Sequence, residues 1–489
     1  MKKINILLAA ACMLLASTSC EGLLDVKNPS GIYGSDYWAN MDQVKSYLTG
    51  TYTRFRSTWN SLEYFEARGD EFIAGLEGSG SNQWAHNLTS TNGLGWGSYY
   101  TTIQHCNMII RNIDKVNFPN KNDRDQILAE AYAMRASMYF SLVRLWGDCP
   151  LELVPTEGSA KEKLPRSPKT DVMKQILEDC DTAIGLFPTD GWAKGKARAS
   201  KRGVYAMKAD ALLWKAKVLE GTTQDLQDVI TYADLAAEGS SLEEDFSQIY
   251  STSNRNGKEV IWCIYYGYPE TSGDSYTHFM TLRDVFVEKA VNKDLIPYAK
   301  SGARSSYAPS TAFRNIFNRY PGDVRKNNAF IDAVDASGNV LGTSQLKMPG
   351  TKTETNVIFD TDQILYRHAE MIMFKAEAQA ALGHPDLAID ELNKIRKRAG
   401  IGPYSGATDK VSVEREILEE RGREFWLENK RWPDLLRFHH EGIIDVYAMV
   451  PKLKERADAG IIVPLYFDIP LSDLSLNHKL THTEGYEEL

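Results

Sequence analysis

The sequence predicts a mainly α-helical protein made of tetratricopeptide-like helical hairpins around an irregular, loop-rich insert that contains a little β structure. Apolar residues recur every three or four positions over long stretches, which places them on one face of each predicted helix. Alanines are frequent on these faces, so that paired helices can approach closely. The periodicity lapses over about 241–360, and we therefore expect helical repeats over about 37–240 and 361–440 with the insert between them.

The clearest hairpin lies directly after the insert. Its first helix is expected to carry the apolar face Leu365–Ala380, and Gly383 suits the left-handed end of that helix. Pro385 suits the first turn of the second helix, which is expected to stop at Gly400. Two helices of about 15–20 residues joined by a tight turn have the size of a tetratricopeptide repeat.

A charged helix follows this hairpin. We expect it to begin at Ser412, whose hydroxyl can cap the first turn, and to continue through the run Glu420–Glu424. This run is expected to form a solvated or salt-bridged structural face, and a catalytic cleft is the alternative. Pro433 marks the place where a further helix can start.

The remaining elements can be placed in chain order. A polar and aromatic loop over 63–92 is long for a helical protein, and loops of that length are usually functional or disordered. The β-branched and aromatic run Glu259–Tyr266 predicts a strand, and the C-terminal segment 446–489 is expected to be extended. The other predicted helices are Tyr37–Thr58, a helix from Trp96, a helix through Leu128 and Tyr139, Thr170–Phe187, Lys201–Glu220 and Leu226–Glu238.

The start of the chain predicts export. Residues 1–19 combine two lysines with a short apolar core, as in a secretory signal, and Cys20 follows small residues as it does at a bacterial lipoprotein processing site. We expect an acylated Cys20, a tether over 20–36 and a single domain over 37–489. Ordinary signal-peptidase cleavage, with no acylation of Cys20, is the alternative.

The composition of the chain argues against a nucleic-acid-binding protein and against a cysteine metal site. The chain has 489 residues and a formal charge of −9, which argues against a nucleic-acid surface. We expect no metal site and no cofactor. The cysteines of the expected domain are scattered without a C-x-x-C pair, so buried free thiols are expected and disulfide pairing in an exported protein is the alternative. They are Cys106, Cys149, Cys180 and Cys263.

Four blocks of sequence resemble one known family. The segments Glu416–Phe438 (EILEERGREFWLENKRWPDLLRF) and Leu365–Gly383 (LYRHAEMIMFKAEAQAALG) are similar to its helical signatures, and Ala129–Glu152 and the tail Leu476–Tyr486 are similar to two more of its segments. Gly422 departs from the pattern, where the family usually carries arginine. The family is SusD/RagB, the surface nutrient-binding lipoproteins of Bacteroidetes. The resemblance implies a protein at the outer-membrane surface that captures a nutrient, usually an oligosaccharide, and passes it to a SusC-like TonB-dependent transporter.

No motif predicts catalysis. The chain has no H-E-x-x-H, no G-x-S-x-G, no P-loop and no G-x-G-x-x-G. Nothing singles out two of the many acidic residues as a glycosidase pair. We therefore expect a binding protein rather than an enzyme. A surface glycoside hydrolase, a peptide-binding relative of the same fold and a pure assembly scaffold remain alternatives.

A binding site for sugar is expected on the loops. Sugars have apolar faces that stack on aromatic rings, and their hydroxyls bind planar polar groups. We expect Trp84 to stack on a sugar ring while Asn82 and Gln83 bind hydroxyls. The alternative for Trp84 is a loop anchor packed inward, and for each tyrosine a core position. The tyrosines of the insert expected to complete the site are Tyr266, Tyr268, Tyr276 and Tyr307.

Overall fold

The structure is a computed structural model that describes residues 36–78, 80–156, 162–192, 194–270, 279–297, 299, 303–354 and 357–486. The expected signal peptide, Cys20 and the expected tether up to residue 35 lie outside the described residues, as does Tyr276. Over the described ranges, no helix combines the length and the apolar character that crossing a bilayer requires.

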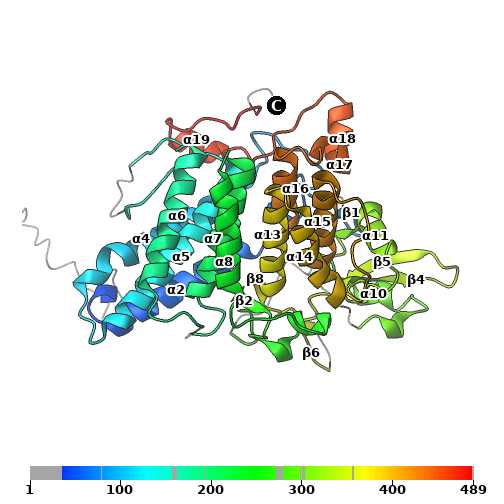
Figure 1. Ribbon diagram of the computed structural model, residues 1–489, viewed down its shortest axis with the longest axis horizontal. Helices are drawn as coiled ribbons and strands as arrows, with labels where there is room; N and C mark the ends of the chain where they lie inside the picture. The colour runs from blue at the N-terminus through cyan, green and yellow to red at the C-terminus, as the bar shows by residue number, and fades with distance from the viewer. Residues whose placement is uncertain are drawn as a thin grey trace, which may run out of the picture.

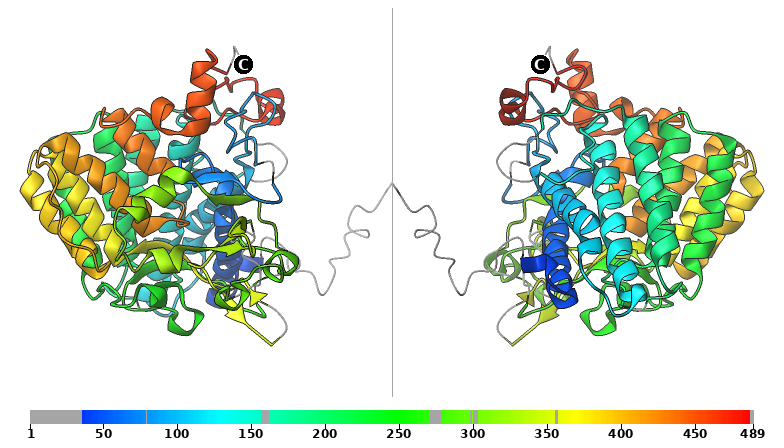
Figure 2. Two further views of the ribbon diagram at one scale, coloured as in Figure 1. Left: turned by 90° about the vertical axis from the view of Figure 1, so that its right-hand side faces the viewer. Right: turned by 90° about the vertical axis from the view of Figure 1, so that its left-hand side faces the viewer.

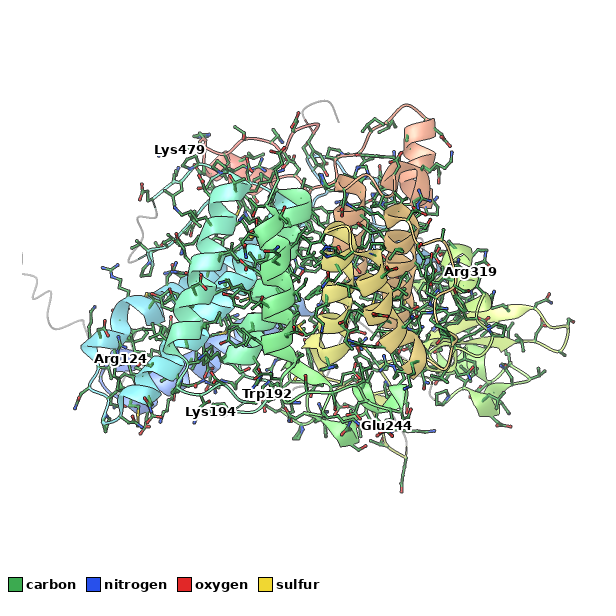
Figure 3. All side chains as sticks on the ribbon, in the orientation of Figure 1. Arg124, Trp192, Lys194, Glu244, Arg319 and Lys479 are labelled. Atoms are coloured by element: carbon green, nitrogen blue, oxygen red, sulfur yellow. The ribbon has the colours of Figure 1, made fainter. Side chains whose placement is uncertain are left out.

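Helices dominate the described chain and stand side by side (Figure 1). Their side chains fill the spaces between neighbouring helices (Figure 3). The main helices before the insert are α2 (Met41–Trp59), α4 (Gly97–Asn112), α5 (Lys121–Trp146), α6 (Lys169–Leu186), α7 (Lys201–Val218) and α8 (Thr223–Ala237). Those after it are α13 (His368–Ala381), α14 (Pro385–Arg398), α15 (Lys410–Phe425) and α16 (Arg431–His440).

Consecutive helices pack on one another from α4 to α8, as the hairpin prediction requires. Helix α8 then packs against α13, which in turn packs against α14, and α14 packs against α15, so the two groups of helices form one stack despite the insert.

Local signals set the ends of these helices. Thr222 and Asp225 form a capping box at α8, Gly383 has the predicted left-handed backbone (φ +81°) after α13, and Pro385 occupies the first turn of α14.

The two ends of the insert lie side by side, because a strand near its start pairs with a strand at its end. Strand β2 (Val260–Ile264) pairs antiparallel with β8 (Gln363–Arg367), just before α13. The prediction that Leu365 lies in the first helix of the hairpin is therefore wrong. Every residue of β8 is buried, so apolar side chains are favoured at every position of this strand. Leu365 can therefore fit the three-to-four-residue spacing of the following helix although it lies in a strand. The pairing with β2 decides the conformation.

The charged run of α15 is salt-bridged but not solvated. Glu420, Arg421, Arg423 and Glu424 are all buried. Glu424 pairs with Arg367, which is fully buried as well (Nη1–Oε1 2.6 Å). Helix α15 also begins earlier than predicted, because the Asp409 carboxylate, rather than Ser412, caps its first turn.

Gly422 makes room for a neighbouring arginine inside this helix. A Cβ atom at this position would lie 3.1 Å from Arg431 Nη1 and 3.3 Å from Ile316 Cδ1. Arg431 is held in place, because its Nη1 donates a hydrogen bond to the Leu418 carbonyl (2.9 Å). A glycine here costs about 1 kcal/mol of helix propensity, and the close approach of Arg431 explains why it is tolerated.

The insert and the loop before α4 are joined by strand pairing. Strand β1 (Phe72–Ala74), from the loop, pairs antiparallel with β3 (Tyr307–Pro309), from the insert. This pairing brings the segment that carries Trp84 onto the insert. The other elements of this region are α3 (Leu62–Phe65), α10 (Asp284–Val287), α11 (Thr311–Asn318), α12 (Lys326–Ala329), β4 (Phe330–Val334), β5 (Val340–Gln345), β6 (Thr351–Lys352), β7 (Val357–Ile358) and the 3₁₀ turns Phe246–Tyr250, Thr252–Asn254 and Lys293–Leu295.

The prediction that the C-terminal segment 446–489 is extended is wrong for part of its length. It contains α17 (Val446–Met449), α18 (Pro451–Asp458) and α19 (Leu471–Leu476), whereas the stretch between α18 and α19 and the described residues 477–486 after α19 have no helix. Figure 2 shows α18 and α19 at the same end of the molecule as the blue segment that precedes α4. The C-terminal helices therefore frame the loop that carries Trp84.

The expectation of buried free thiols is confirmed for the four described cysteines. Cys106, Cys149, Cys180 and Cys263 are all buried, and none of them is in a disulfide.

Candidate functional site

The loop Ser81–Asn87, which we call the Trp84 loop, holds its tryptophan in a defined position. The indole Nε1 of Trp84 donates a hydrogen bond to the Phe72 carbonyl (3.0 Å), at the start of β1. The backbone N–H of Trp84 donates to Ser81 Oγ (3.1 Å). The ring stays half-buried, with the Lys452 ammonium of α18 5.2 Å from its centroid. The anchored ring thus keeps part of its surface open to solvent.

Gly80 creates the space for this ring. Its backbone is left-handed (φ +72°), and a Cβ atom there would lie 2.1 Å from Trp84 Cε3. Any other residue would therefore collide with the indole and would adopt an unfavourable backbone conformation as well.

Tyr307 lies beneath the loop rather than on its surface. It is 2% exposed, and its hydroxyl donates to Glu63 Oε1 (2.7 Å) and accepts a hydrogen bond from the Ser81 backbone N–H (3.2 Å). Ser81 Oγ donates to the same Glu63 carboxylate. Burial raises the pKa of Glu63, and the hydrogen bonds from Ser81 and Tyr307 act in the opposite direction and lower it in part. Tyr307 therefore supports the loop and offers no ring face to a ligand.

The other predicted residues are dispersed. Asn82, two positions before Trp84 in the same loop, is exposed, whereas Gln83 is buried, with its amide 3.5 Å from the Asn92 carbonyl. Tyr266 is 4% exposed and packs in the main core, so it presents no ring face either. Tyr268 is 63% exposed but follows β2 in the insert. Of the described residues predicted for the site, Trp84, Asn82 and Tyr268 remain accessible.

A buried histidine anchors the far end of the loop. His86 Nε2 donates to the Arg68 carbonyl (2.9 Å), and burial together with the nearby Arg68 charge lowers the pKa of His86 well below its usual value. The Arg68 guanidinium in turn lies 4.3 Å from the Trp432 ring and donates to the Pro464 and Leu465 carbonyls. The neutral imidazole is therefore a structural group.

Sequence reasoning missed Arg68, Trp432 and Lys452 as supports of this loop. Trp432 and Lys452 lie more than 300 positions from Trp84 in the chain, and no local pattern marks them as its neighbours. Over the described ranges, no group of three or more histidine, cysteine, aspartate or glutamate side chains is arranged to hold a metal ion.

A cavity of about 790 Å³ lies elsewhere, between the start of α4 and α19. None of the described residues predicted for the site line it. Its position was not foreseen, because it forms where the start of α4 meets segments that lie about 50 and 370 positions further along the chain.

Two family models match the chain. Residues 324–486 match the model described as the SusD family, and residues 23–213 match the model described as "Starch-binding associating with outer membrane". The SusD-like protein P38 of Formosa agariphila is 26% identical over 506 residues, which cover 95% of this chain and 96% of that protein.

Solved structures share the fold. B. fragilis NanU superposes with a TM-score of 0.79 at 23% identity, covering 94% of this chain and 100% of that one. A laminarin-binding SusD-like protein superposes with a TM-score of 0.73 at 19% identity, covering 92% of this chain and 100% of that one. The two family models, the relative that spans nearly the whole chain and the shared stack of helical hairpins agree: this chain belongs to the SusD/RagB family.

Proposed function

We propose that this protein binds a nutrient glycan at the outer-membrane surface, with the Trp84 ring as a stacking platform. The observation that carries the proposal is the anchored, half-buried indole, which Gly80 and the Phe72 carbonyl hold in place. A ring that is already fixed loses little conformational entropy when a sugar stacks on it. The descriptions of a matching family model (starch-binding) and of a structural neighbour (laminarin-binding) favour glycans as the ligand class.

The polar groups of the site are few. Asn82 is exposed in the same loop as Trp84, and its side-chain amide can exchange hydrogen bonds with sugar hydroxyls. The Lys452 ammonium, near the ring, offers further donors. Tyr268 is a separate exposed ring that a long glycan would have to reach from the Trp84 loop. Gln83, Tyr266 and Tyr307 take structural roles in this proposal because they are buried.

The proposal includes anchoring and delivery. An acylated Cys20 would hold the domain at the outer membrane, since each buried CH₂ group contributes about 0.8 kcal/mol and several acyl chains make attachment effectively permanent. The bound glycan would then pass to a SusC-like TonB-dependent transporter. Moderate affinity suits this role, because the ligand has to be released. Replacing Cys20 with alanine should release the protein from the outer-membrane fraction, and retention of the variant there would contradict the anchor.

Calorimetry of Trp84→Ala tests the site. With laminarin and soluble starch as ligands, the variant should lose at least about tenfold in affinity, equivalent to 1.4 kcal/mol. The matched control is Trp192→Ala, which removes another half-buried indole that is hydrogen-bonded to a backbone carbonyl, that of Ile261 (2.7 Å). Equal affinity of wild type and Trp84→Ala for every glycan that binds would remove Trp84 from the site.

The same glycans separate binding from catalysis. Incubation of the purified protein with them should produce no new reducing ends, because we propose capture without bond cleavage. Release of reducing ends would instead support a surface glycoside hydrolase.

A further inference from the structure

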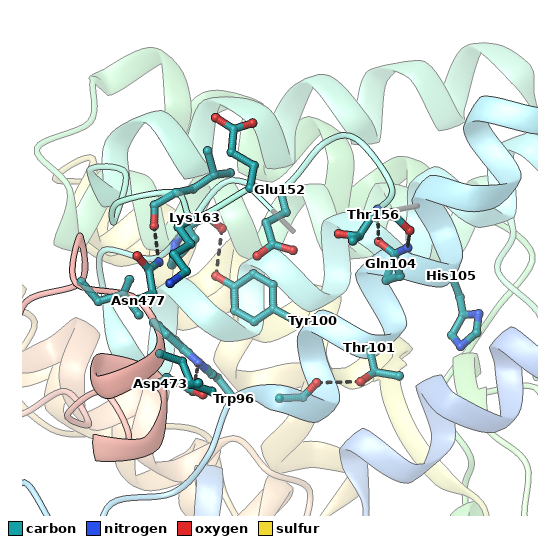
Figure 4. Close-up of a pocket in the computed structure, with 16 residues that line it drawn as sticks. Trp96, Tyr100, Thr101, Gln104, His105, Glu152, Thr156, Lys163, Asp473 and Asn477 are labelled. Atoms are coloured by element: carbon teal, nitrogen blue, oxygen red, sulfur yellow. Dashed lines mark hydrogen bonds between the residues drawn. The ribbon is translucent and has the colours of Figure 1, made fainter. Parts of the chain in front are cut away.

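The cavity beside α4 has the size of a ligand site. Its volume of about 790 Å³ lies within the roughly 300–1,000 Å³ of small-ligand sites. Its walls come from the first turns of α4, the segment 150–156, the segment 162–164 and α19 with the residues that follow it (Figure 4). We call this space the α4–α19 cavity. It is lined by no residue of the Trp84 loop.

Hydrogen bonds across the walls hold the cavity open on the α4 side. Gln104 Nε2 donates to the Thr156 carbonyl (2.9 Å), and the Thr156 N–H donates back to Gln104 Oε1 (3.0 Å). One helical turn earlier, the Tyr100 hydroxyl donates to the Pro150 carbonyl (2.8 Å). The segment 150–156 is thus fastened to α4 at both of its ends.

The opposite wall is fastened in the same way. Trp96 Nε1 donates to Asp473 Oδ2 (2.6 Å), which ties α19 to the start of α4. Asn477 Nδ2 donates to the Leu164 carbonyl (2.8 Å), which ties the residues after α19 to the segment 162–164. Because each wall is bonded to another, the cavity is preformed, and a ligand would not have to order it.

The lining combines rings with polar side chains. Tyr100 contributes a half-buried aromatic ring, and Trp96, which is 4% exposed, forms part of the wall beside it. Figure 4 shows Glu152 and Lys163 near Tyr100, from the segments 150–156 and 162–164 respectively. Rings beside donors and acceptors are the chemistry that a sugar requires, because its C–H faces stack and its hydroxyls form hydrogen bonds.

The charges of the lining disfavour an acidic ligand. Among the described lining residues, the carboxylates of Glu152, Glu162 and Asp473 outnumber the single lysine ammonium, that of Lys163. His105 adds no positive charge near neutral pH, because burial and the nearby Arg54 lower the pKa of its imidazole. Excess negative charge repels a uronate or a sulfated sugar and leaves neutral sugars as the favoured class.

We propose that the α4–α19 cavity is a second saccharide site, which takes neutral sugar residues and is separate from the Trp84 loop. The proposal rests on the proposed function in that it assigns the same ligand class. It places a further part of the glycan against Tyr100, next to the buried Trp96. Helices α18 and α19 lie at the same end of the molecule (Figure 1), so the two proposed sites lie near the same end.

Fluorine NMR of protein labelled with 5-fluorotryptophan tests the proposal, because Trp84 and Trp96 report on the two sites separately. The probes are maltohexaose, laminarihexaose and a mixture of neutral monosaccharides, with oligogalacturonate as the anionic probe. We expect a neutral probe to shift the Trp96 resonance both in wild type and in Trp84→Ala, and oligogalacturonate to leave it in place. A Trp96 resonance that no neutral probe shifts, or that oligogalacturonate shifts as strongly, would overturn the proposal.

A pair of glycine variants localises the effect. Gly97 lines the cavity, and a Cβ atom there meets nothing within 4 Å, so Gly97→Phe adds a bulky ring to the cavity wall from a position where a side chain can start without a clash. Gly95 is equally unobstructed but does not line the cavity, so Gly95→Phe is the matched control. Gly97→Phe should weaken the Trp96 response at least tenfold, and Gly95→Phe should leave it intact. Equal responses in the two variants would place the ligand outside the cavity.

The two proposals fail in different ways. If Trp84→Ala keeps full glycan affinity while the Trp96 response persists, the Trp84 loop is not a site and the cavity is. If the Trp84 resonance responds and the Trp96 resonance does not, the cavity is not a saccharide site and the proposed function stands.

Discussion

Arg431 and Asp70 lie 361 positions apart in the sequence and form a two-point ion pair, with Nε–Oδ1 at 2.7 Å and Nη2–Oδ2 at 2.8 Å. Both residues are buried. Asp70 directly precedes the segment that leads through β1 to the Trp84 loop, and Arg431 begins α16. The pair therefore fastens the candidate binding loop to the helical stack.

Removal of one member of this pair should destabilise the protein strongly. Asp70→Asn removes the two-point ion pair and leaves the buried Arg431 guanidinium with only the longer Glu71 contact (3.8 Å), which costs about 3–5 kcal/mol. Urea unfolding followed by circular dichroism should show this loss in the free energy of unfolding. The control is Glu178→Gln in the exposed pair with Lys174, where no measurable change is expected. A loss in Asp70→Asn as small as that of the control would show that the pair does not stabilise the fold.

Gly80→Ala should reduce glycan binding without touching a ligand-contacting group. The added methyl group would lie 2.1 Å from Trp84 Cε3, so the indole has to leave its position. The left-handed backbone adds roughly 1–2 kcal/mol of strain. Calorimetry should give a loss of affinity similar to that of Trp84→Ala, whereas Gly95→Ala, at an unobstructed glycine, should bind as wild type does. Wild-type affinity in Gly80→Ala would show that the position of the ring is unimportant.

Glu66 should make stability depend on pH. Burial raises the pKa of Glu66 to about 7, and burial together with the nearby Glu66 charge raises the pKa of Glu71 as well. The folded protein therefore holds a proton that the unfolded chain, with a glutamate pKa of about 4.3, has released. The contribution to stability is fully present below about pH 4.3 and is lost as the pH rises through about 7.

The variant Glu66→Gln isolates this effect. Urea midpoints measured from pH 5 to pH 8 should fall less steeply with pH in the variant than in wild type. Parallel curves would show that Glu66 does not hold the proton.

The four described cysteines should be unreactive in the native protein. Burial raises the pKa of Cys106 and of Cys149 to about 12, so almost no thiolate is present at neutral pH. Ellman's reagent should label the protein that starts after Cys20 only when a denaturant is added, and then at four thiols per chain. Rapid labelling without denaturant would contradict the buried positions, and fewer than four thiols after denaturation would indicate a disulfide.

The helices were predictable because their signals are local. Gly383, Pro385 and the capping residues act within one or two turns, and the apolar spacing of a helix is visible in any short window. The wrong prediction for Leu365 arose because its conformation depends on a contact with a distant part of the chain. A buried strand and a buried helix both require apolar residues, and pairing with Val260–Ile264, about 100 positions earlier, decides between them.

The surroundings of the candidate site residues were predictable only in part, and the site itself stays a prediction. Loop composition pointed to Trp84 and Asn82, and both are accessible. The same reasoning chose Tyr266 and Tyr307, which are buried, because an aromatic residue in a polar segment is equally compatible with a core position. The α4–α19 cavity left no local signal, since its lining comes from segments that meet only in the folded chain.

The sequence by itself determined the hairpin architecture, the family and the absence of a recognisable catalytic motif, because periodicity, caps and short motifs need no partners from elsewhere in the chain. Only the tertiary structure decided that the charges of α15 are buried, that Gly80 seats Trp84 and that a bonded cavity opens beside α4. Burial, ion pairing and cavity shape depend on contacts between residues hundreds of positions apart, and no local window of sequence contains them.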